Sequence, residues 1–207
     1  MAVSFDASSI GNVISGTTNV SFSHTCAANA TLLIVGCGER SVVSGVTYNG
    51  VAMTSATGAF NNGASNNSNI FYLLNPATGT NTVVVSHSSG ATVAIAMSFI
   101  GAGSISGATT ATGNSTTPSV TITSTTNSLV ADWVNHNQGA ILTATGTGQT
   151  RQQHLEQANA VAGSSTTGAA STTVSYSCVG ANLWSIGAVS IDPIVNSERP
   201  SFLLNFI

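Results

Sequence analysis

Apolar and polar residues alternate with a period of two along most of this chain, the pattern of half-buried β-strands. The alternating segments are rich in Val, Ile, Thr and aromatic residues, which favour pleated sheets. They are residues 18–24, 31–38, 45–48, 70–74, 80–87, 92–99, 119–123, 128–135, 149–154, 172–178 and 183–191. No stretch has convincing helical periodicity, and residues 152–161 fit a short helical turn or a strand edge with a loop equally well. The pattern therefore predicts an all-β protein.

The punctuation between these segments agrees with antiparallel strands. Gly, Asn, Ser and Pro cluster there, as they do in turns. The sharpest example is Asn49-Gly50 between Tyr48 and Val51. Asn-Gly between apolar residues is a strong hairpin signal because both positions accept a positive φ.

The chain also resembles itself. TNVSFSHTCAANATLLIVGCG (18–38) is similar to PSVTITSTTNSLVADWVNH (118–136), and TNTVVVSHSSGATVAIAMSFIGA (80–102) is similar to STTVSYSCVGANLWSIGAVSI (171–191). One such half has an apolar face that it cannot bury alone, whereas two facing halves enclose a core about 10 Å thick. We expect a single jelly-roll-like antiparallel β-sandwich over residues 1–193, with half-repeats at about 17–102 and 116–191 joined by a loop at 103–117.

Residues 194–207 depart from this pattern. A polar linker that includes Pro200 leads into an apolar segment whose large side chains are Phe202, Leu203, Leu204, Phe206 and Ile207. Burying each such side chain contributes roughly 1.5–3 kcal/mol, so the segment is expected to dock on protein. As an extended C-terminal strand, it either closes the sandwich of its own chain or adds to a neighbouring copy by β-augmentation.

Charge is nearly absent. Charged residues make up 4% of the chain, there is no lysine, and the formal net charge is -3. Three scattered arginines cannot form a nucleic-acid surface, and no apolar run is long enough for a membrane span. The N-terminus shows no signal peptide. A nearly uncharged surface favours self-association; a secreted chain of protease-resistant composition is the simpler alternative.

Two kinds of modification are compatible with the sequence. Cys26 and Cys178 both end a predicted strand and form the better disulfide pair, and small buried hydrophobes are the alternative reading of the cysteines. Asn-x-Ser/Thr sequons stand at Asn19, Asn29, Asn66 and Asn114.

Candidates for chemistry are weak. His24 and His87 occupy similar strand ends, where we expect solvated side chains rather than a metal site. Asp132 and Glu156 are the mid-chain acids in strand-like surroundings, and an Asp132–Arg151 pair across strands is the simplest use of the first. No nucleophile elbow or phosphate loop is present. We therefore expect no enzyme activity, no catalytic residue, no metal and no cofactor.

Sugar binding is the alternative to a structural role. Sandwich modules often stack sugars on exposed aromatic rings, but most rings here fall within alternating strands, where we expect core positions. Phe60, in a polar loop, is expected to be exposed. The candidate rings are Tyr48, Phe60, Tyr72, Trp133, Tyr176 and Trp184.

The chain contains the segments VSGVTYNGVAMT, FYLLNPATGTNTVVVS and WSIGAVSIDP. These segments resemble a widespread group of small, uncharacterised β-sandwich proteins of uncultured bacteria and their phages. The resemblance extends to about Pro193 and implies a surface or virion-type structural role without functional residues. The sequence thus predicts a self-assembling subunit of an extracellular filament or phage-like particle, with copies of itself as partners, located outside the cell or on a virion surface; a glycan-binding module is the alternative.

Overall fold

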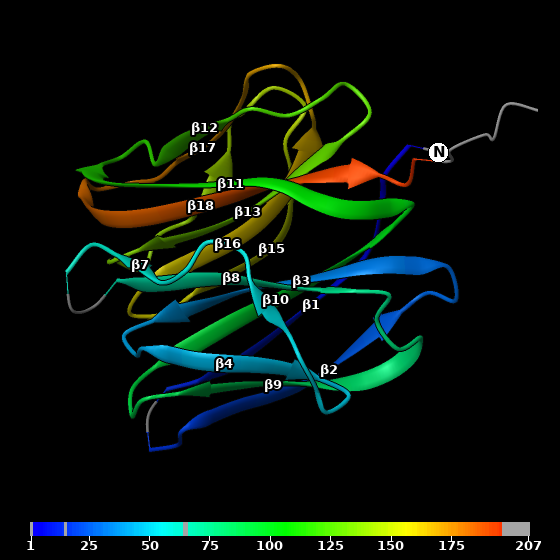
Figure 1. Cartoon of the computed structure of the whole chain (residues 1–207). Coiled ribbons are helices and arrows are strands. Elements are labelled where there is room, and N and C mark those ends of the chain that lie inside the picture. The colour runs from blue at the N-terminus through cyan, green and yellow to red at the C-terminus, as the bar shows by residue number, and fades with distance from the viewer. Residues whose placement is uncertain (1, 15, 64–65, 196–207) are drawn as a thin grey trace, which may run out of the picture.

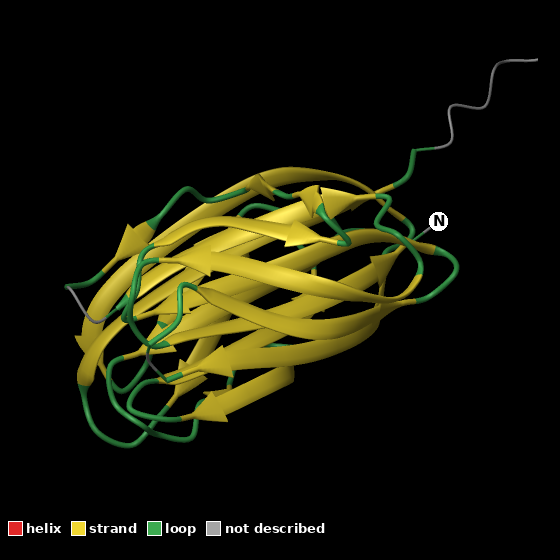
Figure 2. Cartoon of the chain, turned by 90° about the horizontal axis from the view of Figure 1, so that it is seen from below, coloured by secondary structure: helices red, strands yellow, loops and turns green. Residues whose placement is uncertain are grey.

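The computed structural model describes residues 2–14, 16–63 and 66–195, and every regular element in these ranges is a β-strand (Figures 1 and 2). The first half contains β1 (Ser4–Val13), β2 (Asn19–Cys26), β3 (Ala30–Glu39), β4 (Val43–Tyr48), β5 (Val51–Ala52), β6 (Thr54–Ser55), β7 (Phe60–Asn61), β8 (Asn67–Leu74), β9 (Gly79–His87) and β10 (Thr92–Ile100). The second contains β11 (Ala102–Ser115), β12 (Ser119–Ile122), β13 (Leu129–His136), β14 (Thr143–Ala144), β15 (Thr150–Glu156), β16 (Ala160–Thr167), β17 (Thr172–Ser177) and β18 (Asn182–Pro193). The predicted all-β class is confirmed, and within these ranges no helix could cross a membrane.

The strands form four antiparallel sheets, two from each half of the chain. The first half has an inner sheet of order β1-β10-β3-β8-β6, with β7 also on β8, and an outer sheet of order β2-β9-β4-β5. The second half has an inner sheet of order β11-β18-β13-β16-β15 and an outer sheet of order β12-β17-β14. Figure 1 shows them stacked from the outer strands β12 and β17 at the top to β4 and β9 at the bottom.

Three apolar cores separate the four layers. The central core lies between the two inner sheets and contains Trp133, Ile95 and Phe99. Each half encloses a core of its own between its inner and outer sheet, around Tyr48 in the first half and Tyr176 in the second. The sandwich is therefore deeper than the pair of facing sheets expected from the sequence, because each half already folds into two layers.

The side-chain pattern explains which strands lie inside. The inner strands β3, β10, β13 and β18 are buried on both faces over most of their length. The outer strands β2 and β12 alternate between exposed and buried positions. A strand that packs on both faces needs a continuous apolar run, whereas a strand with one face in water needs alternation. The depth of the stack thus follows from LLIVGCG and TVAIAMSF carrying side chains for two cores at once.

The two halves place their strands in corresponding order. In each inner sheet the first strand of the half lies at the edge, next to the last strand, which in turn pairs with the third. The segments that resemble each other in sequence occupy equivalent places, since 18–38 forms β2 and β3 while 118–136 forms β12 and β13. This is the arrangement that a duplication would produce; the duplication and the jelly-roll-like connectivity stay predictions.

The expected loop at 103–117 is wrong. Most of it belongs to β11, which pairs with β18 along an edge of the inner sheet. Ala102 lies opposite Pro193 at one end of this pairing, and Ser115 lies opposite Asn182 at the other. The segment escapes detection because its alternation uses Gly, Ala, Ser and Thr instead of large apolar residues. Similarly, the ambiguous stretch 152–161 is strand β15, a turn and the start of β16.

Small residues opposite large ones set how closely the inner sheets approach. A Cβ atom built on Gly36 of β3 would lie 2.7 Å from the Cβ of Trp133 on β13, so the indole packs directly on the glycine. On β18, a Cβ atom at Gly187 would meet the ring of Phe60 at 2.7 Å. Phe60 is therefore part of the central core and only 8% exposed, and its predicted exposure is wrong.

A buried polar network joins the halves at one end of this interface. The indole Nε1 of Trp133 donates to Ser68 Oγ at 3.0 Å, and Ser68 Oγ bonds Ser185 Oγ at 2.8 Å. Ser185 donates to Asn66 Oδ1, while Asn66 Nδ2 donates to the Asn135 carbonyl at 3.0 Å. Asn66 is fully buried, which argues against glycosylation there in the folded chain.

We expect Gly36→Ala to lower the free energy of unfolding by about 1–3 kcal/mol, because the added methyl group forces β3 and Trp133 apart. Urea unfolding followed by tryptophan fluorescence measures this change. Gly45→Ala is the matched control, since a Cβ at Gly45 meets nothing within 4 Å. Equal stability of the two variants would contradict close contact between the inner sheets.

Candidate functional site

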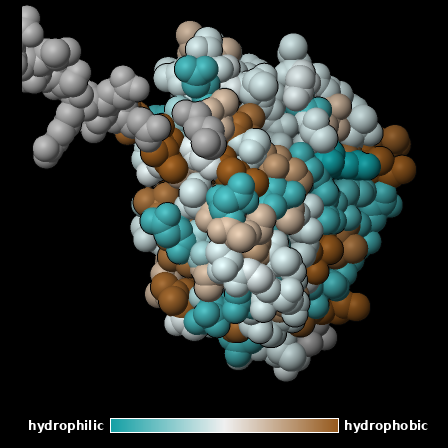
Figure 3. All heavy atoms as spheres, turned by 90° about the vertical axis from the view of Figure 1, so that its right-hand side faces the viewer, coloured by the Kyte–Doolittle hydropathy of each residue, from teal (hydrophilic) through white to brown (hydrophobic). Residues whose placement is uncertain are grey.

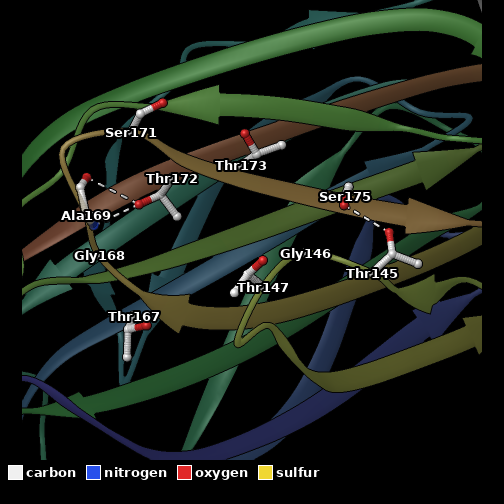
Figure 4. Close-up of a pocket in the computed structure, with 10 residues that line it drawn as sticks. All are labelled: Thr145, Gly146, Thr147, Thr167, Gly168, Ala169, Ser171, Thr172, Thr173 and Ser175. Carbon is white, nitrogen blue, oxygen red and sulfur yellow. Dashed lines mark hydrogen bonds between the residues drawn. The ribbon is translucent and has the colours of Figure 1, made fainter.

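A groove lined by hydroxyl groups lies on the second half of the molecule (Figure 4). It has a volume of about 500 Å³ and is formed by the β14–β15 turn, the end of β16 with the turn after it, and β17. Its lining residues are Thr145, Gly146, Thr147, Thr167, Gly168, Ala169, Ser171, Thr172, Thr173 and Ser175. The site is therefore a surface of small polar side chains and exposed backbone.

Hydrogen bonds hold the walls of the groove in place. Thr145 Oγ1 and Ser175 Oγ are 2.9 Å apart, and they join the β14–β15 turn to β17. Thr172 Oγ1 accepts from the amide of Ala169 at 2.9 Å, which tightens the β16–β17 turn. Both contacts are drawn as dashed lines in Figure 4. The hydroxyls that line this groove are thus partly committed to its own structure.

Gln149 connects the groove to the interior. Its Oε1 accepts from the amides of Gly146 at 2.9 Å and Ser175 at 3.0 Å, and its Nε2 donates to Ser164 Oγ at 2.7 Å. Ser164 in turn donates to Asp132 Oδ2. The groove therefore rests on a buried polar chain that ends at a carboxylate.

Asp132 is buried between the inner and outer sheets of the second half. Tyr176 donates to its Oδ1 at 2.6 Å, and Gln149 Nε2 lies 3.4 Å from its Oδ2. Burial raises the pKa of Asp132 to about 6, although the hydrogen bonds from Ser164 and Tyr176 oppose the shift. The acid does not line the groove, so we assign it the structural task of anchoring these polar side chains.

The predicted Asp132–Arg151 pair is not formed. Both residues lie in register with Ser164, but on opposite sides of β16, so a whole strand separates them. Arg151 instead donates to the carbonyl of Leu142. Glu156, the other candidate acid, is exposed near the end of β15. The two carboxylates therefore do not converge on one site.

The groove offers hydrogen bonds to a neutral polar ligand but no platform for stacking. Its ten lining residues include no aromatic ring, acid, imidazole or thiol. Of the candidate rings, Tyr48, Trp133, Tyr176 and Trp184 are core residues, as predicted, and Tyr72 packs partly against the central core. The sugar-stacking surface that the sequence suggested is therefore not assembled from these rings.

The two histidines with similar surroundings lie apart. His24 pairs with Asn81 near one end of the β2–β9 ladder, and His87 lies at the other end. Both are buried, so the prediction of solvated side chains is wrong. Burial lowers the pKa of His24 to about 4, and its Nδ1 lies 2.8 Å from Ser9 Oγ. Within the described ranges, no group of three potential ligands for a metal ion is found.

The cysteines are unpaired in this structure. Cys26 lies in the core of the first half, and Cys178 packs against the core of the second, so the predicted disulfide between them is wrong. The structure instead places Cys178 Sγ 3.4 Å from Nε2 of the buried His136. Burial raises the pKa of the Cys178 thiol, so His136 does not face an activated thiolate at neutral pH. Sequence reasoning missed this contact because the residues are far apart in the chain.

The remaining predicted sites divide by exposure. Asn19, Asn29 and Asn114 are exposed and accessible to a glycosylating enzyme, unlike Asn66. The assembly residues Phe202, Leu203, Leu204, Phe206 and Ile207 lie outside the described residues.

We expect the stability of the protein to fall between about pH 4 and pH 6 through the titration of Asp132. Its pKa is higher in the folded chain than the ordinary value, so the folded state binds more protons in this window. The loss in the free energy of unfolding that results from ionising buried Asp132 is absent below pH 4 and reaches roughly 3 kcal/mol above pH 6. Urea unfolding across this range should show the fall in the native protein and a flatter profile in Asp132→Asn. The exposed acid Glu156 provides the control Glu156→Gln, which should keep the native profile; identical profiles for all three proteins would refute the role of Asp132.

We expect one thiol to react before the others. Cys178 is half-buried, whereas Cys26 and Cys37 are 1% and 0% exposed. Titration of the native protein with a chromogenic disulfide reagent should modify Cys178 first, and unfolding should release the other two. Cys178→Ser should lose the early phase. If unfolding without a reducing agent released only one thiol in total, two of the three cysteines would be joined in a disulfide, which would contradict this prediction.

No protein-family model and no curated protein sequence matches this chain.

Proposed function

We propose that this protein is a structural subunit whose copies assemble through the segment that follows Val195. The observation that carries this proposal is how the chain leaves the sandwich. The amide of Ile194 still bonds the Gly101 carbonyl at 2.9 Å, but Ile194 is 41% and Val195 is 85% exposed. The sequence then continues to the apolar residues 201–207, whose burial requires a protein surface.

The body of the molecule suits a building block. Four sheets packed through three cores resist bending, because close-packed interiors deform little. The surface carries even less charge than the composition suggests, since Glu39 and Asp132 are buried. Copies therefore experience little electrostatic repulsion at close range.

The end from which the chain leaves has a mixed surface. Figure 3 looks onto this end and shows apolar patches scattered among polar side chains, with no single broad apolar face in that view. Such a surface supports contacts of moderate strength between copies, but this view shows no broad apolar site on which the apolar segment could dock. Docking on a neighbouring copy therefore accounts for the segment better than packing on this face.

The place of action is also part of the proposal. The resemblance of VSGVTYNGVAMT and WSIGAVSIDP to surface and virion-type proteins favours an extracellular filament or a phage-like particle. Sugar binding is the second candidate, and the hydroxyl-lined groove is the feature that favours it. A glycan array separates the two. A specific glycan that binds the native protein, and no longer binds after Thr145 or Ser175 is replaced, would favour sugar binding over assembly.

We expect deletion of residues 201–207 to convert polymers into monomers while the far-ultraviolet dichroism of the β-sheets stays unchanged. Sedimentation velocity and negative-stain microscopy of the full chain and the deletion variant measure this. The control changes only polar positions of the same segment, Ser201→Ala with Asn205→Ala, and should still assemble. Polymers of the same form from the shortened chain would refute the role of the segment.

A further inference from the structure

The strand β3 ends on a buried acid whose carboxylate oxygens make no hydrogen bond that meets normal geometry. Glu39 is 0% exposed, and neither of its carboxylate oxygens has a hydrogen-bond partner in the structure. Its φ of 129° is one that residues other than glycine rarely adopt. Burial raises the pKa of this carboxyl, although the charge of Arg40 and the nearby backbone amide of Asn159 oppose the shift. An unpaired buried carboxyl is costly, so a missing partner is expected.

Glu39 lines an apolar cleft between the two halves. The cleft has a volume of about 520 Å³ and is formed by Ile14, Glu39 with Arg40, the β9–β10 turn at Gly90 and Ala91, and the β15–β16 turn at Gln157 and Ala158. Ile14 is 75% exposed there, although it is a large apolar residue. Such a lining suits an occupant that brings both a cation and apolar side chains.

The chain itself contains a segment of this kind. Among its nine charged residues, two pairs of adjacent opposite charges occur, Glu39-Arg40 and Glu198-Arg199. The second pair immediately precedes the apolar segment 201–207. In an extended chain, neighbouring side chains point to opposite sides. An extended 198–199 can therefore direct Arg199 inward and Glu198 outward, which matches the buried Glu39 and the exposed Arg40.

We propose that this cleft receives residues 198–202 of a second copy, with Arg199 against the Glu39 carboxylate, Glu198 facing Arg40, and Phe202 on the apolar lining. This proposal rests on assembly through the segment after Val195 and names the surface that accepts it. The edge strand β11 is the competing acceptor for an extended segment, but it carries no charged residue and so does not select a Glu-Arg pair.

The geometry favours a second copy over the same chain as the source of Arg199. The chain leaves the sandwich beside the start of β3, since Pro193 pairs with Ala102, whose amide bonds Thr31 Oγ1 at 2.8 Å. Glu39 lies eight residues further along β3, about 26 Å away at the rise of a strand. The four residues from Val195 to Arg199 span at most about 14 Å. The backbone at Arg199 of the same chain therefore stops roughly 12 Å short of Glu39, so that the two side chains would meet only if both were fully extended.

Donor and acceptor consequently lie at opposite ends of the molecule. In Figure 1 the end of β18 lies on the right, whereas the β9–β10 connection, which lines the cleft, lies on the left. A contact between two different surfaces is heterologous, and it repeats from copy to copy until a ring closes or a filament grows. The proposed contact thus gives head-to-tail polymers.

A double-mutant cycle on the full chain tests the charge pair. Glu39→Gln and Arg199→Gln should each weaken association at least tenfold in sedimentation velocity, and the double variant should be no weaker than the worse single variant. Glu156→Gln removes one exposed acid and should leave association unchanged. Additive effects, or unchanged association in both single variants, would overturn the pairing.

Cysteine crosslinking tests the location independently of charge. In a Cys178→Ser background, one chain carries Ala158→Cys at the cleft and another carries Ser201→Cys. Mixing them under oxidising conditions should give a disulfide-linked dimer of the two different chains. A crosslink that forms only when both cysteines are in one chain would show that the segment binds its own molecule, and no crosslink would indicate another acceptor such as β11. Either result would overturn this proposal.

The two levels of the proposal fail differently. If the full chain polymerises and deletion of 201–207 prevents it, but Glu39→Gln and the crosslink have no effect, then the cleft is wrong and the assembly function stands. If the full chain stays monomeric at all concentrations, both are wrong.

Discussion

Burial of both faces of the inner strands is the constraint on which this architecture depends. β3 and β13 each contribute side chains to two cores, and they meet where the indole of Trp133 packs on Gly36. A larger residue at Gly36 separates the inner sheets, while a smaller one at Trp133 opens the central core. The two outer sheets then complete the remaining faces, so the four-layer stack follows from how β3 and β13 meet.

Polar groups fix how these layers are aligned. The network from Trp133 to Ser68 and Asn66 spans the two halves at one end of the central core, and Asp132 joins the inner and outer sheets of the second half through Tyr176. Buried polar groups are stable when every member is satisfied, and their directional bonds disfavour sliding of one sheet over another. Within the described residues, Glu39 departs from this rule, as do Nε2 of His24 and Nε2 of His87, but only Glu39 lines a cleft, and we therefore interpret it as the site that binds a partner.

A subunit of this kind needs an attractive contact and little repulsion. The scarcity of charge keeps the repulsion between copies small, and the apolar segment after Val195 would provide the attractive contact. With so few charges on the surface, a single buried pair such as Glu39 with Arg199 would determine orientation, because few competing ionic contacts exist. Specificity would then come from one desolvated pair within an otherwise apolar contact.

The sequence by itself determined the all-β class and most strand positions, because period-two alternation in segments such as 80–87 reports directly on burial. It also placed Trp133 and Tyr176 in the core. The edge strand β11 was not predicted, because edge positions tolerate small polar residues whose composition is also typical of loops. The burial of Phe60, His24 and Asn66, the separation of Cys26 from Cys178, and the cleft at Glu39 were decided only by the tertiary structure. Each depends on which sheet covers which face, and strands far apart in the sequence supply that cover.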